Sequence, residues 1–299
     1  MVLTGLVPLI IVMVPLATVL NRNLKEQEEK KLSETARQLG RLIAEVTDRT
    51  ARELSSLQSN PLLSDPSGNI ETKITEMHRL VEIFEVYSDI SLYDDEGFLL
   101  GSTSEDHPSY REYSDWFRGA LKGNVTLSHP QRIIGKEGLY LTVFLPIKSS
   151  QDEGDGETRQ VIKASLSFAR IISIIEDGRI GGDNSIYMLD ALGNTLSGGD
   201  PTRLMEKFDP DIPAKIWLEH RIGTYEVPGG DSFLYASEIL PTSVTNLDSP
   251  WIILALKPMD KVTAVVRQAY LALVAAAVCM ILVAGTLGAF LSKVISRPL

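Results

Sequence analysis

The chain has few of the residues that carry chemistry. Its 299 residues include one cysteine and four histidines. The histidines, at 78, 107, 129 and 220, do not have the spacing of metal ligands. A single cysteine cannot form an internal disulfide, so cysteine usage does not report the redox compartment. The motifs of serine hydrolases, zinc peptidases and phosphate-binding loops are also missing. The sequence therefore favours binding over catalysis and predicts no cofactor and no metal site.

Charge is absent from two long stretches, Val2 to Leu20 and Ala269 to Leu291. A helix needs about 20 apolar residues to cross the hydrocarbon core of a bilayer. We therefore predict transmembrane helices at residues 2–20 and 269–291. The first stretch has a signal peptide as its alternative, although it lacks a basic start, and the second has a buried core helix.

The acidic residues all lie between these two stretches. The formal net charge is -10, and of the basic residues only Lys293 and Arg297 lie outside that interval. A strongly acidic domain is a poor partner for nucleic acid. Basic residues after a membrane helix favour the cytoplasmic side. We expect a two-span protein of the inner (plasma) membrane, with the large domain extracytoplasmic or periplasmic.

Residues 21–60 have the pattern of one long amphipathic helix. Apolar residues recur there at steps of three and four, at Leu32, Ala36, Leu39, Ile43, Val46, Leu54 and Leu57. A helix of this length is unusual inside a globular domain and is typical of a stalk or a coiled coil. We expect it to form a parallel homodimer through the face that carries Leu32, Leu39 and Ile43.

The rest of the domain alternates short helices and strands. SLYDDEGFLL (91–100) indicates strand, turn and strand, YSDWFRGALKG (113–123) a short helix, and LYLTVFLPI (139–147) another strand. The same order returns with IYMLDALGNTL (186–196) and ends on WIILALKP (251–258). We predict an α+β fold with two tandem modules, each an antiparallel sheet with flanking helices, at residues 61–180 and 181–260.

This series of segments, between two membrane spans, resembles the double Cache sensor domain. The resemblance covers about residues 21–268. It implies two PAS-like modules outside the membrane, the first of them distal. The terminal VISRPL (294–299) is similar to the start of a HAMP linker, so residues 292–299 are expected to begin one.

The resemblance implies a small-molecule ligand in the distal module. In the amino-acid-binding branch of this family, an aromatic pair falls on Trp116 and Phe117 of this chain. The family's Arg falls on Ser114, its Tyr on Gln131 and its Asp on Ser165, so three polar anchors are missing. The candidate binding residues are Tyr113, Ser114, Trp116, Phe117, Gln131, Arg132, Tyr140 and Ser165.

Without the Arg and the Asp, capture of a zwitterion is in doubt, because both of its buried charges need partners. A carboxylate remains a candidate ligand, with Arg111, Arg118 or Arg132 as its clamp or as surface charges. An uncharged ligand and the absence of any small ligand are the alternatives.

Two acidic clusters suggest metals. Asp94, Asp95 and Glu96 fit a hairpin turn better than a metal site. Residues 152–157 lack the spacing of an EF-hand and fit a solvated loop.

These observations predict the sensing half of a bacterial transmembrane receptor. Its output, encoded beyond residue 299, would be a histidine kinase, a chemotaxis transducer or a diguanylate cyclase. The alternative is a membrane-tethered binding or assembly module without cytoplasmic output. An enzyme ectodomain is disfavoured.

Overall fold

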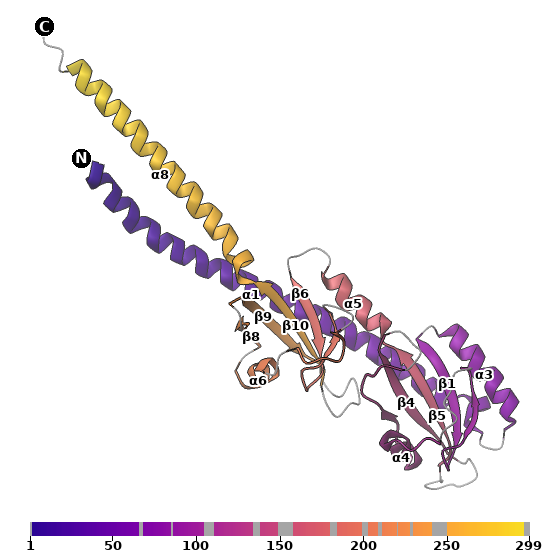
Figure 1. Cartoon of the computed structure of the whole chain (residues 1–299). Helices are drawn as coiled ribbons and strands as arrows, with labels where there is room; N and C mark the ends of the chain where they lie inside the picture. Colours follow the sequence, from indigo (N-terminus) through magenta and orange to yellow (C-terminus); the bar gives the residue numbers. More distant parts are fainter. Residues whose placement is uncertain are drawn as a thin grey trace. The chain divides into compact units, whose positions relative to one another are not determined.

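Figure 1 shows the computed structural model of the chain. The structure describes residues 2–65, 68–84, 86–104, 111–133, 138–148, 158–179, 184–198, 203–208, 211–219, 221–227, 230–240 and 250–295. For residues 2–17 and at scattered later positions it describes the backbone and not the side chain. Two compact units result: residues 1–34, 222–236 and 256–299 form one, and residues 35–221 and 237–255 form the other.

Helix α1 (Val2–Gln58) runs without a break through the predicted first span and the predicted stalk. Most side chains of residues 2–20, and those of residues 292–299, lie outside the described part, so the first span and the HAMP-like linker stay predictions. Within the part that is described, no helix combines the length and the apolar character that crossing a bilayer requires.

The apolar stripe of α1 is buried within a single copy of the chain. Leu32, Leu39 and Ile43 are at most 5% exposed. Leu39 packs against Gly178, where an added Cβ would come within 2.8 Å of its side chain. The prediction that this stripe forms a dimer interface is therefore wrong, because the chain's own fold already covers it.

The first sheet follows α2 (Pro61–Ser64) and α3 (Ile70–Ile83). Its strands are β1 (Tyr87–Asp94), β2 (Leu99–Ser102), β3 (Thr126–Leu127), β4 (Tyr140–Lys148) and β5 (Thr158–Ser167), in the order β2-β1-β5-β4-β3. Helix α4 (Asp115–Leu121) lies between β2 and β3 in the chain. The central strands β1, β5 and β4 pair antiparallel, so residues on adjacent strands face each other in register.

The second sheet follows α5 (Ala169–Arg179). Its strands are β6 (Ser185–Leu189), β7 (Thr195–Ser197), β8 (Ile222–Glu226), β9 (Ser232–Ile239) and β10 (Ile252–Pro258), in the order β7-β6-β10-β9-β8. Helix α6 (Asp211–Leu218) precedes β8, and α8 (Met259–Ile295) follows β10. The two sheets have the same strand order relative to the chain, and the predicted α+β fold of two tandem modules is confirmed.

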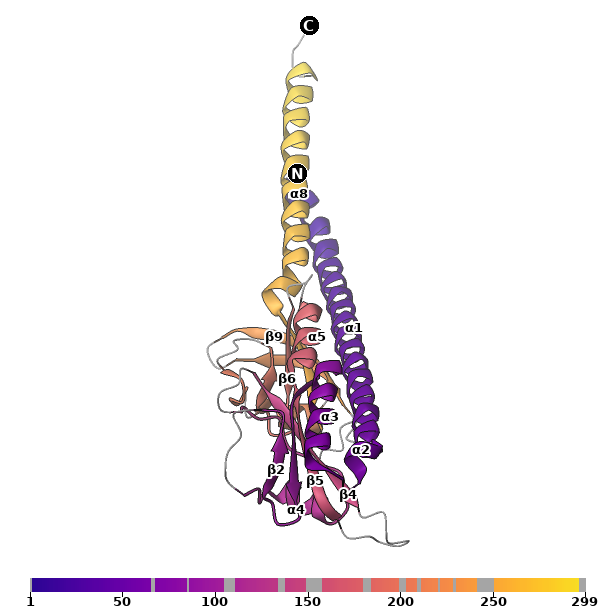
Figure 2. The same cartoon turned by 90° about the vertical axis from the view of Figure 1, so that its right-hand side faces the viewer.

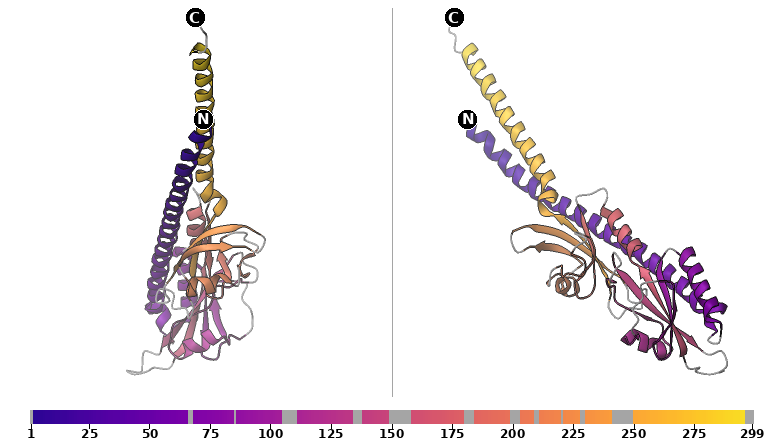
Figure 3. Two further views of the ribbon diagram at one scale, coloured as in Figure 1. Left: turned by 90° about the vertical axis from the view of Figure 1, so that its left-hand side faces the viewer. Right: turned by 45° about the vertical axis from the view of Figure 1, so that its right-hand side comes forward.

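The two faces of the first sheet differ in chemistry. Side chains alternate between the faces along a strand. On β5, Ile162, Ala164 and Leu166 lie on one face and are buried, as are Ile90, Leu92, Val143 and Leu145 from the neighbouring strands. Helix α3 covers this face, where the buried Lys73 Nζ lies 2.6 Å from Gln160 Oε1. Figure 1 shows α3 beside β1, with α4 on the other side of the sheet, and Figures 2 and 3 show the chain from other directions.

Candidate functional site

The face of the first sheet that α4 covers, called here the α4 face, is apolar at one end. Ser114 caps α4, since its Oγ accepts a hydrogen bond from Phe117 N at 3.2 Å. This cap directs the buried Phe117 onto the sheet, edge to face with Tyr93 and with Phe144, at centroid distances of 6.1 and 6.4 Å. These rings, with Ala120 and Val161, form a closed apolar cluster.

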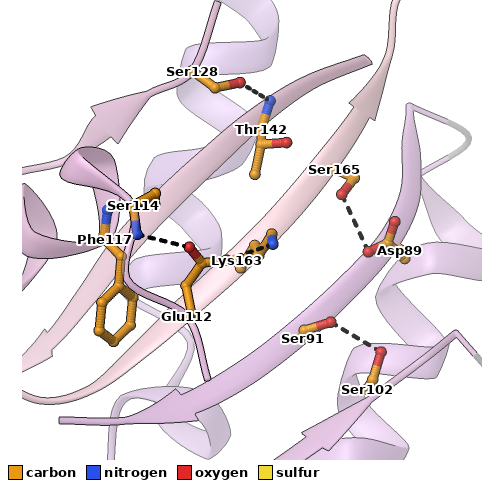
Figure 4. Close-up of polar contacts among 10 residues, drawn as sticks. All are labelled: Asp89, Ser91, Ser102, Glu112, Ser114, Phe117, Ser128, Thr142, Lys163 and Ser165. Carbon is orange, nitrogen blue, oxygen red and sulfur yellow. Dashed lines mark hydrogen bonds and ion pairs between the residues drawn. The ribbon is translucent and has the colours of Figure 1, made fainter. Parts of the chain in front are cut away.

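The rest of the α4 face is polar and largely buried (Figure 4). Ser165 Oγ donates to Asp89 Oδ2 at 3.1 Å, and the hydroxyls of Ser91 and Ser102 lie 2.9 Å apart. On β4, Thr142 N donates to Ser128 Oγ at 2.9 Å. The side chains of Ser91, Thr142 and Ser165 are each buried. Polar groups in the interior need hydrogen-bond partners, so this cluster of hydroxyls beside a carboxylate distinguishes the α4 face from the apolar face of the same sheet.

Lys163 lies between the apolar and the polar parts of the α4 face. Its Nζ is 2.8 Å from Glu112 Oε2, in an ion pair whose side chains are 21% and 9% exposed. The same Nζ lies 5.8 Å from the centroid of the Tyr93 ring and 5.7 Å from that of Phe144. Both rings attract the ammonium group through their negative faces. The lysine charge is thus held at a defined place on the α4 face.

Glu112 connects this lysine to the start of α4. Its Oε1 accepts a hydrogen bond from Ser114 N at 3.0 Å, and its own N donates to Gly97 O at 2.9 Å. Burial raises the pKa of the Glu112 carboxyl, but the hydrogen bond and charge of Lys163 and the Ser114 amide lower the pKa by more. The pKa is therefore below its ordinary value, and Glu112 is a carboxylate at neutral pH.

The predicted binding residues are divided between this site and the surface. Ser114, Phe117 and Ser165 belong to the site, and the half-buried Trp116 packs against the apolar cluster, with its ring 6.1 Å from that of His129. Tyr113 is 59% exposed.

Of the other predicted residues, Gln131 and Arg132 are exposed, and Gln131 pairs through its backbone with Tyr140, whose side chain is half-buried.

The arginines considered as a carboxylate clamp have other partners. Arg111 pairs with Glu96, 3.5 Å away, and its guanidinium lies over the rings of Phe98 and Tyr113. Arg118 pairs with Asp115 on the exposed side of α4. The cation of the α4 face is Lys163 instead.

Three charged residues of the site, Asp89, Glu112 and Lys163, were not among the predicted ones. The missing signal was the strand alternation of QVIKASLSF, which puts Lys163 and Ser165 on the same face. Asp89 lies opposite Ser165 on β1. A carboxylate therefore lies beside position 165, on the adjacent strand.

The acidic turn has a structural role. Asp94 Oδ1 accepts a hydrogen bond from Phe98 N at 2.7 Å, which closes the turn between β1 and β2 as predicted. Residues 152–157 lie outside the described part. Within the part described, no three His, Cys, Asp or Glu side chains are grouped so that they could hold a metal ion.

Neither protein-family models nor curated proteins match the sequence. Solved structures do match the fold. The ligand-binding domain of Mlp24 with asparagine aligns with a TM-score of 0.64 and 13% identity, over 82% of this chain and 99% of that one. The chain has the fold of a double Cache sensor domain.

Two further structures have this double Cache fold. The ligand-binding domain of the Pseudomonas aeruginosa amino acid chemoreceptor PctC, in complex with GABA, aligns with a TM-score of 0.61 and 14% identity, over 77% of this chain and 99% of that one. The extracellular domain of the putative histidine kinase rpHK1S-Z16 aligns with a TM-score of 0.58 and 16% identity, over 79% of this chain and 97% of that one. The chain spans 40% of a matching extracellular ligand-binding receptor from Desulfohalobium retbaense.

Proposed function

We propose that this chain is the extracytoplasmic sensing half of a bacterial transmembrane receptor. The double Cache fold supports this proposal, because it is similar to the ligand-binding domain of an amino acid chemoreceptor and to the extracellular domain of a putative histidine kinase. The uncharged stretches 2–20 and 269–291 would anchor the domain in the inner membrane. The output of such a receptor would be a histidine kinase as the first candidate, with a chemotaxis transducer or a diguanylate cyclase next.

The ligand that we propose is a small zwitterion bound on the α4 face. One observation carries this proposal: Asp89 Oδ2 lies 3.1 Å from Ser165 Oγ, at the position where the amino-acid-binding pattern has its Asp. An ammonium group in a buried site needs such a carboxylate. Mlp24 and PctC, which have the same fold, were solved with asparagine and with GABA.

Lys163 is the partner that we propose for the carboxylate of the ligand. It replaces the arginine that the pattern would put at Ser114, and it reaches the same end of α4 through Glu112. Glu112 holds the ammonium of Lys163 in place before the ligand binds. A ligand carboxylate would then bind the ammonium of Lys163, either beside Glu112 or in its place.

Signalling would be a shift between two packed states of the receptor. A ligand changes such an equilibrium only by the difference in its affinity for the two states. The proposed receptor is a parallel homodimer, but with a face of α1 other than the buried stripe at its interface.

The test is a binding screen on the whole chain in detergent micelles. Melting temperature is measured with amino acids, ω-amino acids, amines and organic acids. We expect a rise with zwitterions, which is lost in Asp89→Asn and in Lys163→Met and kept in the exposed controls Asp115→Asn and Lys122→Met. A rise with organic acids alone, or one that survives Asp89→Asn, contradicts the zwitterion.

A flat response from a folded chain would contradict small-molecule sensing. It would favour the alternative, a membrane-tethered module that binds another macromolecule without cytoplasmic output.

A further inference from the structure

A cavity lies apart from the α4 face. It has a volume of about 520 Å³ and is bounded by α1, the ends of β4 and β5, the start of α5 and Trp251. All of these residues belong to one compact unit of the chain. Leu141 and Leu166 contribute from the sheet face opposite to that of Ser165, so this cavity and the proposed zwitterion site share no residue.

The floor of the cavity is apolar and rigid. Trp251 and Phe168 are 2% and 1% exposed and pack edge to face, with ring centroids 5.4 Å apart. Leu141, Leu166 and Ile171 line it as well. Ligand pockets typically have volumes of about 300 to 1,000 Å³, apolar walls and a few polar groups that fix orientation. This cavity has a volume in that range, apolar walls and a few polar groups.

The charged groups that line the cavity have a positive excess. They are Arg49, Arg170 and Glu53. Arg49 lies 3.6 Å from Glu45 in a pair whose side chains are 59% and 67% exposed, so solvent screens that pair and it restrains the guanidinium weakly. Arginine binds a carboxylate through two parallel hydrogen bonds, which makes it a suitable orienting group for an anionic head.

A buried hydroxyl, that of Tyr87, lies near Glu53. Tyr87 follows the lining residue Val86, and its buried hydroxyl has no hydrogen-bond partner among the described residues. Burial and the nearby charge of Glu53 both raise the pKa of this hydroxyl, so it is protonated and can donate. This donor lies near Glu53, although Tyr87 itself is not among the residues that line the cavity.

We propose that this cavity is a second binding site, for a small apolar monocarboxylate such as an aromatic acid. The hydrocarbon part would lie against Trp251 and Phe168, and the carboxylate would be held by Arg49 and Arg170. This inference does not rest on the proposed zwitterion site.

A ligand at this place would touch two segments that lead toward the predicted spans. One wall of the cavity is α1, and Trp251 immediately precedes β10, which continues into α8. The second site would therefore act on the same helices as the first, without competing for its residues.

The fluorescence of Trp251 tests the proposal. The chain has three tryptophans, so Trp116→Phe with Trp217→Phe leaves Trp251 as the only one. In the whole chain in detergent, titration with benzoate should give a saturable change in emission. Benzamide and benzylamine, which have the same ring without the negative charge, should bind at least tenfold more weakly.

Arginine variants test the charged part of the site. Arg49→Gln with Arg170→Gln should weaken benzoate binding at least tenfold, whereas the exposed control Arg159→Gln should leave it unchanged. Asp89→Asn and Lys163→Met should also leave it unchanged, which separates this site from the zwitterion site. If the tryptophan variant does not fold, equilibrium dialysis of labelled benzoate against the wild-type chain gives the same comparison.

Equal binding of benzamide, no saturable binding of benzoate, or binding that is insensitive to both arginines would overturn the proposal.

Discussion

Lys257 Nζ lies 2.6 Å from Glu28 Oε2, although the two residues are 229 positions apart in the chain. Their side chains are 18% and 17% exposed. Lys257 is the penultimate residue of strand β10, just before α8 begins, and Glu28 lies on α1. This ion pair thus joins α1, which contains the first predicted span, to the strand that continues into α8, which contains the second.

Loss of this pair should destabilise the domain. Hydrogen bonds to charged groups contribute about 1.5 to 3 kcal/mol when their partners are partly buried. We expect Lys257→Met to lower the free energy of unfolding by roughly this amount, because it leaves the Glu28 carboxylate without its nearest cation. Denaturant unfolding of the whole chain measures the change, with Glu26→Gln in an exposed pair as the control. Equal effects of the two substitutions would contradict a structural role for the pair.

The same pair should make stability depend on pH in the acidic range. Burial raises the pKa of Glu28, but the hydrogen bond and charge of Lys257, together with Lys31, lower the pKa further, below its ordinary value. The contribution is therefore present above the unfolded pKa of about 4.3 and is lost as pH falls through the lower folded pKa. We expect Glu28→Gln to flatten this decline below about pH 4.3, the ordinary pKa of a glutamate. Parallel declines in the wild type and the variant would count against this assignment.

Gly97 should tolerate no side chain, because it supports the segment that carries Glu112. Its φ is +85°, and an added Cβ would overlap the carbonyl oxygen of Glu112. Gly138 has a φ of +87° with nothing within 4 Å among the described residues, so it provides a matched control. A non-glycine residue in this conformation costs about 1 to 2 kcal/mol at either position.

We expect Gly97→Ala to cost at least about 1 kcal/mol more than Gly138→Ala, because it also forces the Glu112 backbone to move. It should weaken ligand binding on the α4 face as well, since Glu112 orients Lys163. Thermal unfolding and the binding screen measure both effects. A Gly97→Ala variant that matches Gly138→Ala in both would show that the segment yields without cost.

The sequence by itself determined the secondary structure and the module count. Alternating apolar residues and an Asp-Glu-Gly turn are local signals that predicted the β1–β2 hairpin correctly, and the segment YSDWFRGALKG predicted helix α4. The stripe of apolar residues predicted the long α1 helix for the same reason, since helix formation depends on neighbours three and four positions away.

Only the tertiary structure decided what these elements face. The stripe on α1 is equally compatible with a partner helix and with the chain's own core, and the fold selects the core. In the proposed site, Asp89 would supply the carboxylate missing at Ser165 and Lys163 the cation missing at Ser114, both from strands distant in sequence. Side chains that converge through strand register cannot be found from local spacing, because the register is set by packing of the whole sheet.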